Sequence, residues 1–166
     1  MKKIFSILVL IVIFLSCKPS KNFLVLVEDA NNGYAYLNTN GDTIIPFGKY
    51  EMCFTDTIKN YGIVLDKELG FIGINMKDEL LFKVMVYDNG PDYISDGMFR
   101  IVDNGKIGYA DEDGKIVIAP QYECAYPFEN GQAKVSLKCS KVTEDEHEMW
   151  NSEEWFFIDK KGEKID

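Results

Sequence analysis

The sequence contains one histidine. It also lacks the spaced residue motifs typical of most nucleophilic catalysts, redox proteins and nucleotide-binding proteins. Any serine or cysteine triad would have to use His147, which lies in a strongly acidic stretch. No two cysteines are separated by two residues, so a zinc site or a thioredoxin-type motif has no support. The glycine patterns of dinucleotide sites, phosphate loops and α/β-hydrolases are also missing. We therefore expect a protein that is not an enzyme and uses no cofactor.

Basic residues are scarce. The chain has 18 Lys and Arg against 27 Asp and Glu, which gives a formal net charge of −9. Nucleic acids are bound by basic surfaces, so we expect no nucleic-acid partner. The same charge opposes electrostatic adhesion to anionic lipids.

No apolar run is long enough to cross a bilayer, which takes about 20 residues. The longest, Ile4–Leu15, follows Lys2 and Lys3 and is typical of a secretory signal. The run ends at Leu15-Ser16-Cys17, which resembles the lipobox of bacterial lipoproteins, although the family prefers Leu where this chain has Phe14. The resemblance implies a signal peptide over residues 1–16 and a lipid on Cys17 whose acyl chains include palmitate. An ordinary cleaved signal or a buried cysteine are the alternatives.

Cys53, Cys124 and Cys139 remain, and outside the cytosol such cysteines can form disulfides. Because three is an odd number, at least one is free or pairs between chains. Cys124 and Cys139 are candidates for a disulfide across a hairpin that turns near Asn130-Gly131.

No stretch of the mature chain shows a helical apolar period. Instead, four segments share one pattern, a β-prone run that ends in Asn or Asp with a turn residue three positions later. They are Tyr34–Asn38, Phe71–Asn75, Ile107–Asp111 and Trp155–Asp159, and their end residues are 37, 36 and 48 residues apart. A recurring period near 36 residues indicates one supersecondary unit used several times.

Each unit reads as strand, short turn, strand, loop and a further strand. The turns are too short for crossover helices, so the strands must form antiparallel meanders. About three or more such units must stack to share a core. We therefore predict an all-β array of meander repeats over residues 23–166, with three full units and a C-terminal partial unit, joined by a tether at 17–22 to the lipid.

The third copy, Lys106–Val135, resembles the bacterial WG repeat. The usual core of that repeat is Lys-Trp-Gly-Tyr-Ile-Asp, a turn with Gly, then Val-Ile-Pro, Gln-Tyr-Asp and later Phe-x-x-Gly-x-Ala-x-Val. The third copy supplies Lys106, Gly108, Tyr109, Asp111, Gly114, Pro120, Gln121, Tyr122, Glu123, Phe128, Gly131, Ala133 and Val135. The tryptophan of the name is Ile107 here and occurs only in the fourth copy, as Trp155.

The resemblance covers about residues 23–166 and implies a β-rich array of a secreted or envelope protein, without a common catalytic residue set. The repeated residues have structural interpretations. The aromatic at the tryptophan place belongs in the core, the glycine permits close approach or a positive φ, and the Asn or Asp starts the turn.

Phe23–Val27 occupies the place in the first unit that Ala133–Leu137 occupies in the fourth. The chain thus starts in mid-unit, as a closed propeller-like ring would require. With so few units we favour an open, twisted array, whose C-terminal edge should be short or charged.

The fourth copy arrives about a dozen residues late because of an insertion at Ser140–Asn151, where we expect a longer hairpin loop or an excursion from the sheet edge. The insertion holds our candidate contact residues, Glu144, Glu146, His147 and Trp150. Its carboxylates also suggest a divalent-cation site, but it lacks the spacing of a calcium loop and resembles a solvated loop.

The sequence predicts a non-enzymatic lipoprotein of the cell envelope, on the outer membrane or a periplasmic face, held to the membrane by Cys17. We expect it to present a β surface to a protein or glycan partner. The alternatives are an envelope hydrolase that uses acidic residues and a calcium-stabilised structural module.

Overall fold

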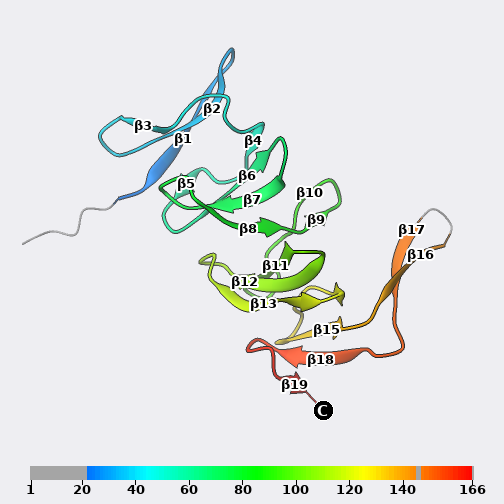
Figure 1. The fold of residues 1–166 in the computed structure, drawn as a ribbon. Helices are drawn as coiled ribbons and strands as arrows, with labels where there is room; N and C mark the ends of the chain where they lie inside the picture. Colours follow the sequence, from blue (N-terminus) through cyan, green and yellow to red (C-terminus); the bar gives the residue numbers. More distant parts are fainter. Residues whose placement is uncertain (1–21, 145–146, 166) are drawn as a thin grey trace, which may run out of the picture.

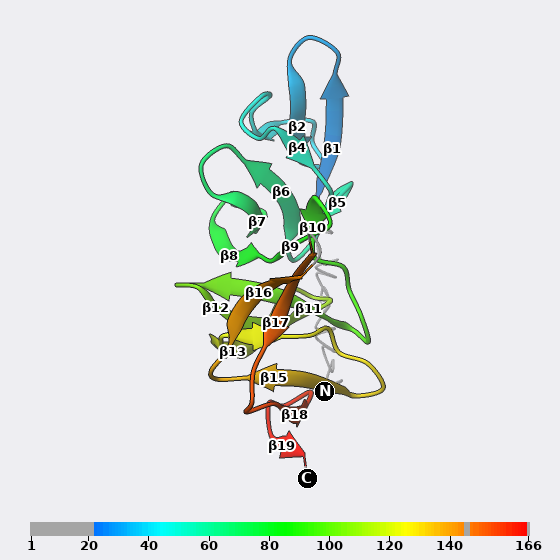
Figure 2. The same cartoon turned by 90° about the vertical axis from the view of Figure 1, so that its right-hand side faces the viewer.

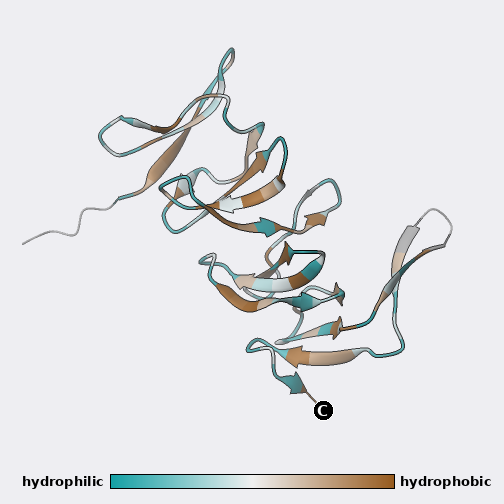
Figure 3. Cartoon of the chain, in the orientation of Figure 1, coloured by the Kyte–Doolittle hydropathy of each residue, from teal (hydrophilic) through white to brown (hydrophobic). Residues whose placement is uncertain are grey.

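The computed structural model describes residues 22–144 and 147–165. The predicted signal peptide, Cys17 and Glu146 therefore lie outside the described residues. The chain is all-β, and its strands are arranged along one axis as an open array (Figure 1). Apolar residues concentrate in the strands and hydrophilic residues at the turns (Figure 3). The predicted fold class is confirmed, including the preference for an open array over a closed ring.

Four three-stranded meanders make up most of the array. They are β1 (Leu24–Asp29), β2 (Gly33–Leu37) and β3 (Thr43–Ile45); β6 (Gly62–Asp66), β7 (Gly70–Ile74) and β8 (Leu80–Val84); β11 (Met98–Asp103), β12 (Lys106–Asp111) and β13 (Ile116–Tyr122); and β15 (Gln132–Ser136), β18 (Phe156–Asp159) and β19 (Lys164–Ile165). The strands between and beside the meanders are β4 (Met52–Cys53), β5 (Thr57–Ile58), β9 (Val86–Tyr87), β10 (Gly90–Pro91), β14 (Cys124–Ala125), β16 (Ser140–Glu144) and β17 (His147–Asn151).

The turn between the second and third strands is the same in all four meanders. In each, the side-chain Oδ1 of the anchoring residue accepts hydrogen bonds from the backbone amides two and four positions later, at 2.8–3.1 Å. The anchoring residues are Asn38, Asn75, Asp111 and Asp159. An acceptor side chain of this length closes the turn on its own backbone. The predicted role of the repeated Asn or Asp is confirmed.

The glycine of the third copy is required by close packing. A Cβ at position 108 would lie 2.5 Å from the backbone nitrogen of Pro120. The next residue, Tyr109, is fully buried, and its hydroxyl donates a 2.7 Å hydrogen bond to the carbonyl of Tyr126. Tyr36 is buried in the same way in the first meander and donates to the carbonyl of Thr55 at 2.6 Å. These tyrosines tie the centre of a meander to the loop that follows it.

Neighbouring meanders are joined through their turns as well as their cores. The hydroxyl of Ser95 donates to the carbonyl of Phe128 at 2.7 Å, and the amide of Gly131 donates to Asp96 at 2.5 Å. Lys160 of the fourth meander reaches the other carboxylate oxygen of Asp96 at 3.0 Å. Stacked turns of this kind give each unit contacts to its neighbours, as repeat arrays require.

The insertion predicted at Ser140–Asn151 is a hairpin of its own, formed by β16 and β17. It leaves the array after β15, runs alongside β11–β13 towards β9 and β10, and returns to enter β18 (Figures 1 and 2). We call this hairpin the arm. The fourth meander is thus completed across the arm, by pairing of β15 with β18 and of β18 with β19.

Candidate functional site: a groove beneath the arm

A groove of ≈ 840 Å³ lies between the arm and the side of the array. Its size is within the range of ordinary ligand sites. Thirteen residues line it: Met85, Val86, Tyr87, Tyr93, Arg100, Tyr126, Pro127, Glu129, Lys141, Val142, Met149, Trp150 and Asn151. Four of these are aromatic and five are aliphatic, so the lining is mainly apolar. We call this surface the aromatic groove.

The arm forms one wall of the aromatic groove. Its strands pair so that Lys141 lies opposite Trp150 and Val142 opposite Met149. The ring of Trp150 packs edge-on against the ring of Tyr126, with 5.3 Å between centroids, and Trp150 also packs on the core of the third and fourth meanders. The arm therefore rests on the array through an aromatic contact, while Val142 and Met149 stay exposed.

The opposite wall is the β9–β10 hairpin of the second repeat. Asp88 and Asn89 both have positive φ, at 45° and 65°, as a two-residue hairpin turn requires. Tyr87 lies edge-on to Tyr93 with 5.1 Å between ring centroids. The tyrosines that correspond to Tyr87 in the first and third copies are 5% and 3% exposed, whereas Tyr87 is 50% exposed. The second copy thus departs from the repeat at the groove.

A buried ion pair supports the floor. Arg100 and Asp92 are joined by Nε–Oδ2 and Nη2–Oδ1 contacts of 2.9 and 2.5 Å, and both residues are at most 5% exposed. Nη1 of Arg100 donates to the carbonyl of Ala125 at 3.2 Å, and its guanidinium carbon lies 5.8 Å from the centre of the Tyr87 ring. Asp92 neutralises the charge of Arg100, and this pair fixes the β9–β10 hairpin to the array.

The base of the arm is fastened at two points. Cys124 of β14 and Cys139, which precedes β16, form a disulfide with 5.9 Å between their Cα atoms. The hydroxyls of Ser136 and Ser152, which flank the insertion, are 2.8 Å apart. The pair that we proposed from the sequence is therefore bonded in the structure, where it holds the arm to the array.

Glu123 adds a third fastening. Its carboxylate accepts hydrogen bonds from Lys106 Nζ at 2.9 Å and from the backbone amide of Cys139 at 2.8 Å. Lys106 and this amide, in that order, hold the pKa of Glu123 below its ordinary value. The carboxylate is thus charged at neutral pH and in that form binds Cys139, the residue just before the arm.

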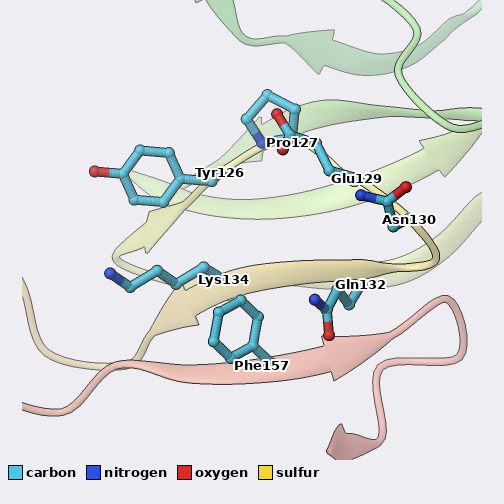
Figure 4. A pocket seen from close by; sticks show the side chains of 7 residues that line it. All are labelled: Tyr126, Pro127, Glu129, Asn130, Gln132, Lys134 and Phe157. Carbon is cyan, nitrogen blue, oxygen red and sulfur yellow. The ribbon is translucent and has the colours of Figure 1, made fainter.

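A second hollow of ≈ 310 Å³ adjoins the aromatic groove, because Tyr126, Pro127 and Glu129 line both. Figure 4 shows Tyr126 and Lys134 towards one end of this hollow and Asn130 and Gln132 towards the other. The ammonium of Lys134 lies 4.9 Å from the ring centre of Trp155, which in turn packs 5.5 Å from Tyr126.

The structure brings only some of the predicted site residues together. Trp150 lies in the groove. Glu144 and His147 pair through their backbones at the far end of the arm, and their side chains are not among those described. Trp155 was expected in the core, and this was wrong: it precedes β18, is only partly buried and packs beside Tyr126.

Sequence reasoning missed the tyrosines of the groove and Arg100. The irregular half of the unit contains Tyr87, Tyr93 and Tyr126. In that half, a β-prone residue has no periodic pattern that tells a binding surface from a strand or loop. A comparison of copies does give one signal. Arg100 of the second unit aligns with Lys134 of the third, so both units carry a long cation as the third residue of the corresponding strand. The burial of Arg100 against Asp92 has no separate sequence pattern.

The described part of the chain offers few clusters of side chains that could catalyse a reaction or bind a metal ion. No cluster of three or more His, Cys, Asp or Glu there is arranged to hold a metal ion. Of the described groove residues, Glu129 alone carries a carboxylate. Residues 22–144 and 147–165 also contain no helix of the length and apolarity needed to traverse a membrane.

Comparison with known families identifies one segment. Residues 107–138 match a family model described as a WG containing repeat. The match begins in β12, spans β13 and β14 and ends beyond β15, so it includes Cys124 and Tyr126 and stops one residue before Cys139. No curated protein matches the chain.

Proposed function

We propose that this chain, in which residues 107–138 match a WG containing repeat, is a non-enzymatic lipoprotein that binds a partner protein through the aromatic groove. The lipid on Cys17 holds it to the membrane of the cell envelope, facing the periplasm or on the outer membrane. Its β array serves as a rigid support, and the arm and the β9–β10 hairpin form the contact surface.

The observation that carries this proposal is the exposure of large apolar side chains around the groove. Val86, Tyr87, Tyr93, Tyr126, Val142 and Met149 are each between 39% and 59% exposed, and all six border one hollow. Exposed apolar residues are ordinary when scattered, but a contiguous patch marks an interaction site. Tyrosine, tryptophan and methionine are also the residues enriched in protein interfaces.

The chemistry of the lining favours a protein over a glycan. Sugar recognition needs several convergent polar side chains beside the aromatic rings. Here Arg100 is already bonded to Asp92 and to the carbonyl of Ala125, and the other charged or amide side chains of the lining are only Glu129, Lys141 and Asn151. The remaining nine lining residues are aliphatic or aromatic. Flexible thioethers and aliphatic chains instead suit the apolar side chains of a polypeptide.

A non-enzymatic role is supported by the ionisable groups of the groove. A hydrolase with paired acids needs two carboxylates that face each other across the site. Among the described residues that line the groove, Glu129 is the single one with a carboxylate.

Co-purification from cross-linked envelopes tests the proposal. The wild type, a variant in which Ser140–Asn151 is replaced by a short turn, and Trp150→Ala are captured in parallel. Phe47→Ala is the matched control, because Phe47 is a large side chain that is 39% exposed just after the first meander and does not line the groove. We expect the same protein with the wild type and Phe47→Ala and its loss with the other two. Equal recovery with all four would refute the groove as the contact surface.

A further inference from the structure

Two short ribbons face the aromatic groove, and both have open edges. The β9–β10 ribbon and the arm each form a separate two-stranded sheet, and no other strand within residues 22–144 and 147–165 pairs with either. In an antiparallel pair, every second residue directs its N–H and C=O away from its partner. The outer edges of the arm therefore present backbone donors and acceptors.

Open edges of this kind are normally protected. Native proteins shorten them, charge them or cover them. The terminal strand β19 follows this rule, since it has two residues, one of which is Lys164. The strands of the arm have five residues each and carry exposed Val142 and Met149 beside the groove. The arm edge is thus long and partly apolar.

We infer that the aromatic groove takes an extended segment of the partner polypeptide, which pairs as an added strand along an edge of the arm. This inference rests on the proposed function and names the form of its ligand. A five-residue strand is about 17 Å long, so the segment that pairs is about five residues. Strand addition supplies affinity through main-chain hydrogen bonds and specificity through alternate side chains.

The groove decides which side chains the segment carries. Alternate residues of an added strand point to the same side, towards Tyr126 and Trp150, whose rings form an apolar shelf. These residues should be aliphatic or aromatic. The remainder of the segment should be basic, since Glu129 lines the groove and the chain carries a net charge of −9. Charge complementarity of this kind raises the rate of association.

The probe for this inference is a synthetic seven-residue peptide with lysine at both ends and valine or phenylalanine at alternate positions between them. Its control is the same peptide with the alternate backbone nitrogens methylated, which removes donors but keeps every side chain. Titration with the oxidised mature protein should show saturable binding of the first peptide and at least about tenfold weaker binding of the second. Trp150→Ala should weaken binding of the first peptide by a similar factor, and Phe47→Ala should not.

Amide hydrogen exchange supplies the structural readout. The peptide should slow exchange at alternate residues of one arm strand, and it should leave the two ribbons folded. Equal affinity for both peptides, or protection without alternation, would overturn strand addition. Absence of binding by the peptide would also overturn it, while the envelope capture experiment decides separately whether the groove binds a protein.

Discussion

The indole of Trp150 lies edge-on against the phenol ring of Tyr126, with 5.3 Å between centroids and 73° between ring planes. Tyr126 belongs to the loop that follows β14, and Trp150 belongs to the arm, which the repeat pattern does not include. This contact therefore joins the regular part of the molecule to its one large insertion. The groove exists because the arm is held at that position. Each contact at the base of the arm can therefore be tested by its own substitution.

Removal of the disulfide should loosen the arm. The bond closes a loop with a sequence separation of 15 residues, for which the chain-entropy estimate is about 3 kcal/mol of stability. The Cys124→Ser/Cys139→Ser variant should lower the free energy of unfolding by about this amount, measured by urea denaturation. Amide exchange should rise first in Ser140–Asn151. An unchanged exchange rate in the arm would show that the disulfide does not hold it in place.

The buried ion pair beneath the groove should be costly to break. Removal of one partner leaves the other charged and buried, which costs about 3–5 kcal/mol. Asp92→Asn keeps the shape of the side chain but removes its charge, so it isolates the electrostatic part of this cost. We expect Asp92→Asn and Arg100→Ala each to lower the urea midpoint strongly. The exposed pair Lys138–Glu154 serves as a control, because Glu154→Gln should change stability by less than about 1 kcal/mol. Similar small effects at both pairs would contradict the burial of Arg100.

Stability should fall in alkaline solution. Burial raises the pKa of Tyr36, Tyr50 and Tyr109 well above the ordinary 10.0, so the folded protein favours the protonated form. Above pH 10.0 the unfolded chain releases these protons and the folded chain retains them, so the contribution of these tyrosines to stability is constant below that pH and declines as pH rises through it. Urea midpoints measured from about pH 8 to about pH 11.5 follow this decline.

Tyr109→Phe provides the control for the alkaline transition. It removes one of several groups whose pKa is raised by burial, which also include Tyr61, Tyr122 and the Cys53 thiol, so the slope of stability against pH should decrease by up to one proton's contribution. It also removes the hydrogen bond to the carbonyl of Tyr126, at a cost of about 1 kcal/mol below pH 10. A slope that is the same in the variant and the wild type would show that Tyr109 does not take part.

The lipid attachment is predicted at Cys17, from the apolar run and the lipobox-like residues that precede it. Radiolabelled palmitate should enter the wild type and should not enter Cys17→Ser, and the variant should leave the membrane fraction. Cys53→Ser is the matched control, since Cys53 is a half-buried thiol within the array and should not affect labelling. Label in Cys17→Ser, or its firm retention in the membrane, would contradict the proposed anchor.

The repeat was predictable because its determinants are local. Asn38, Asn75, Asp111 and Asp159 close the same turn by hydrogen bonds within four residues, so spacing alone identifies them. All-β architecture and an open array followed from turn length and copy number. The insertion at Ser140–Asn151 was also visible, as a break in the period.

The groove was less predictable because it depends on contacts between distant segments. Tyr87 has the sequence context of the buried Tyr50 and Tyr122, yet it is exposed because its chain continues into the β9–β10 hairpin. Trp155 occupies a core place in the alignment, but it lies before β18 and packs on Tyr126. No local pattern records that the arm folds back over the third meander, and this placement is what brings Trp150 to Tyr126.

Site-specific photo-cross-linking tests the central claim most directly. A photoreactive phenylalanine analogue is placed at position 87 in the groove wall or at position 47 just after the first meander, and intact cells of the native host are irradiated. We predict a discrete protein adduct from position 87 that disappears when Trp150→Ala is combined with it, and none from position 47. An adduct of equal yield from both positions, or none from position 87, would contradict the groove as the site where this protein binds its partner.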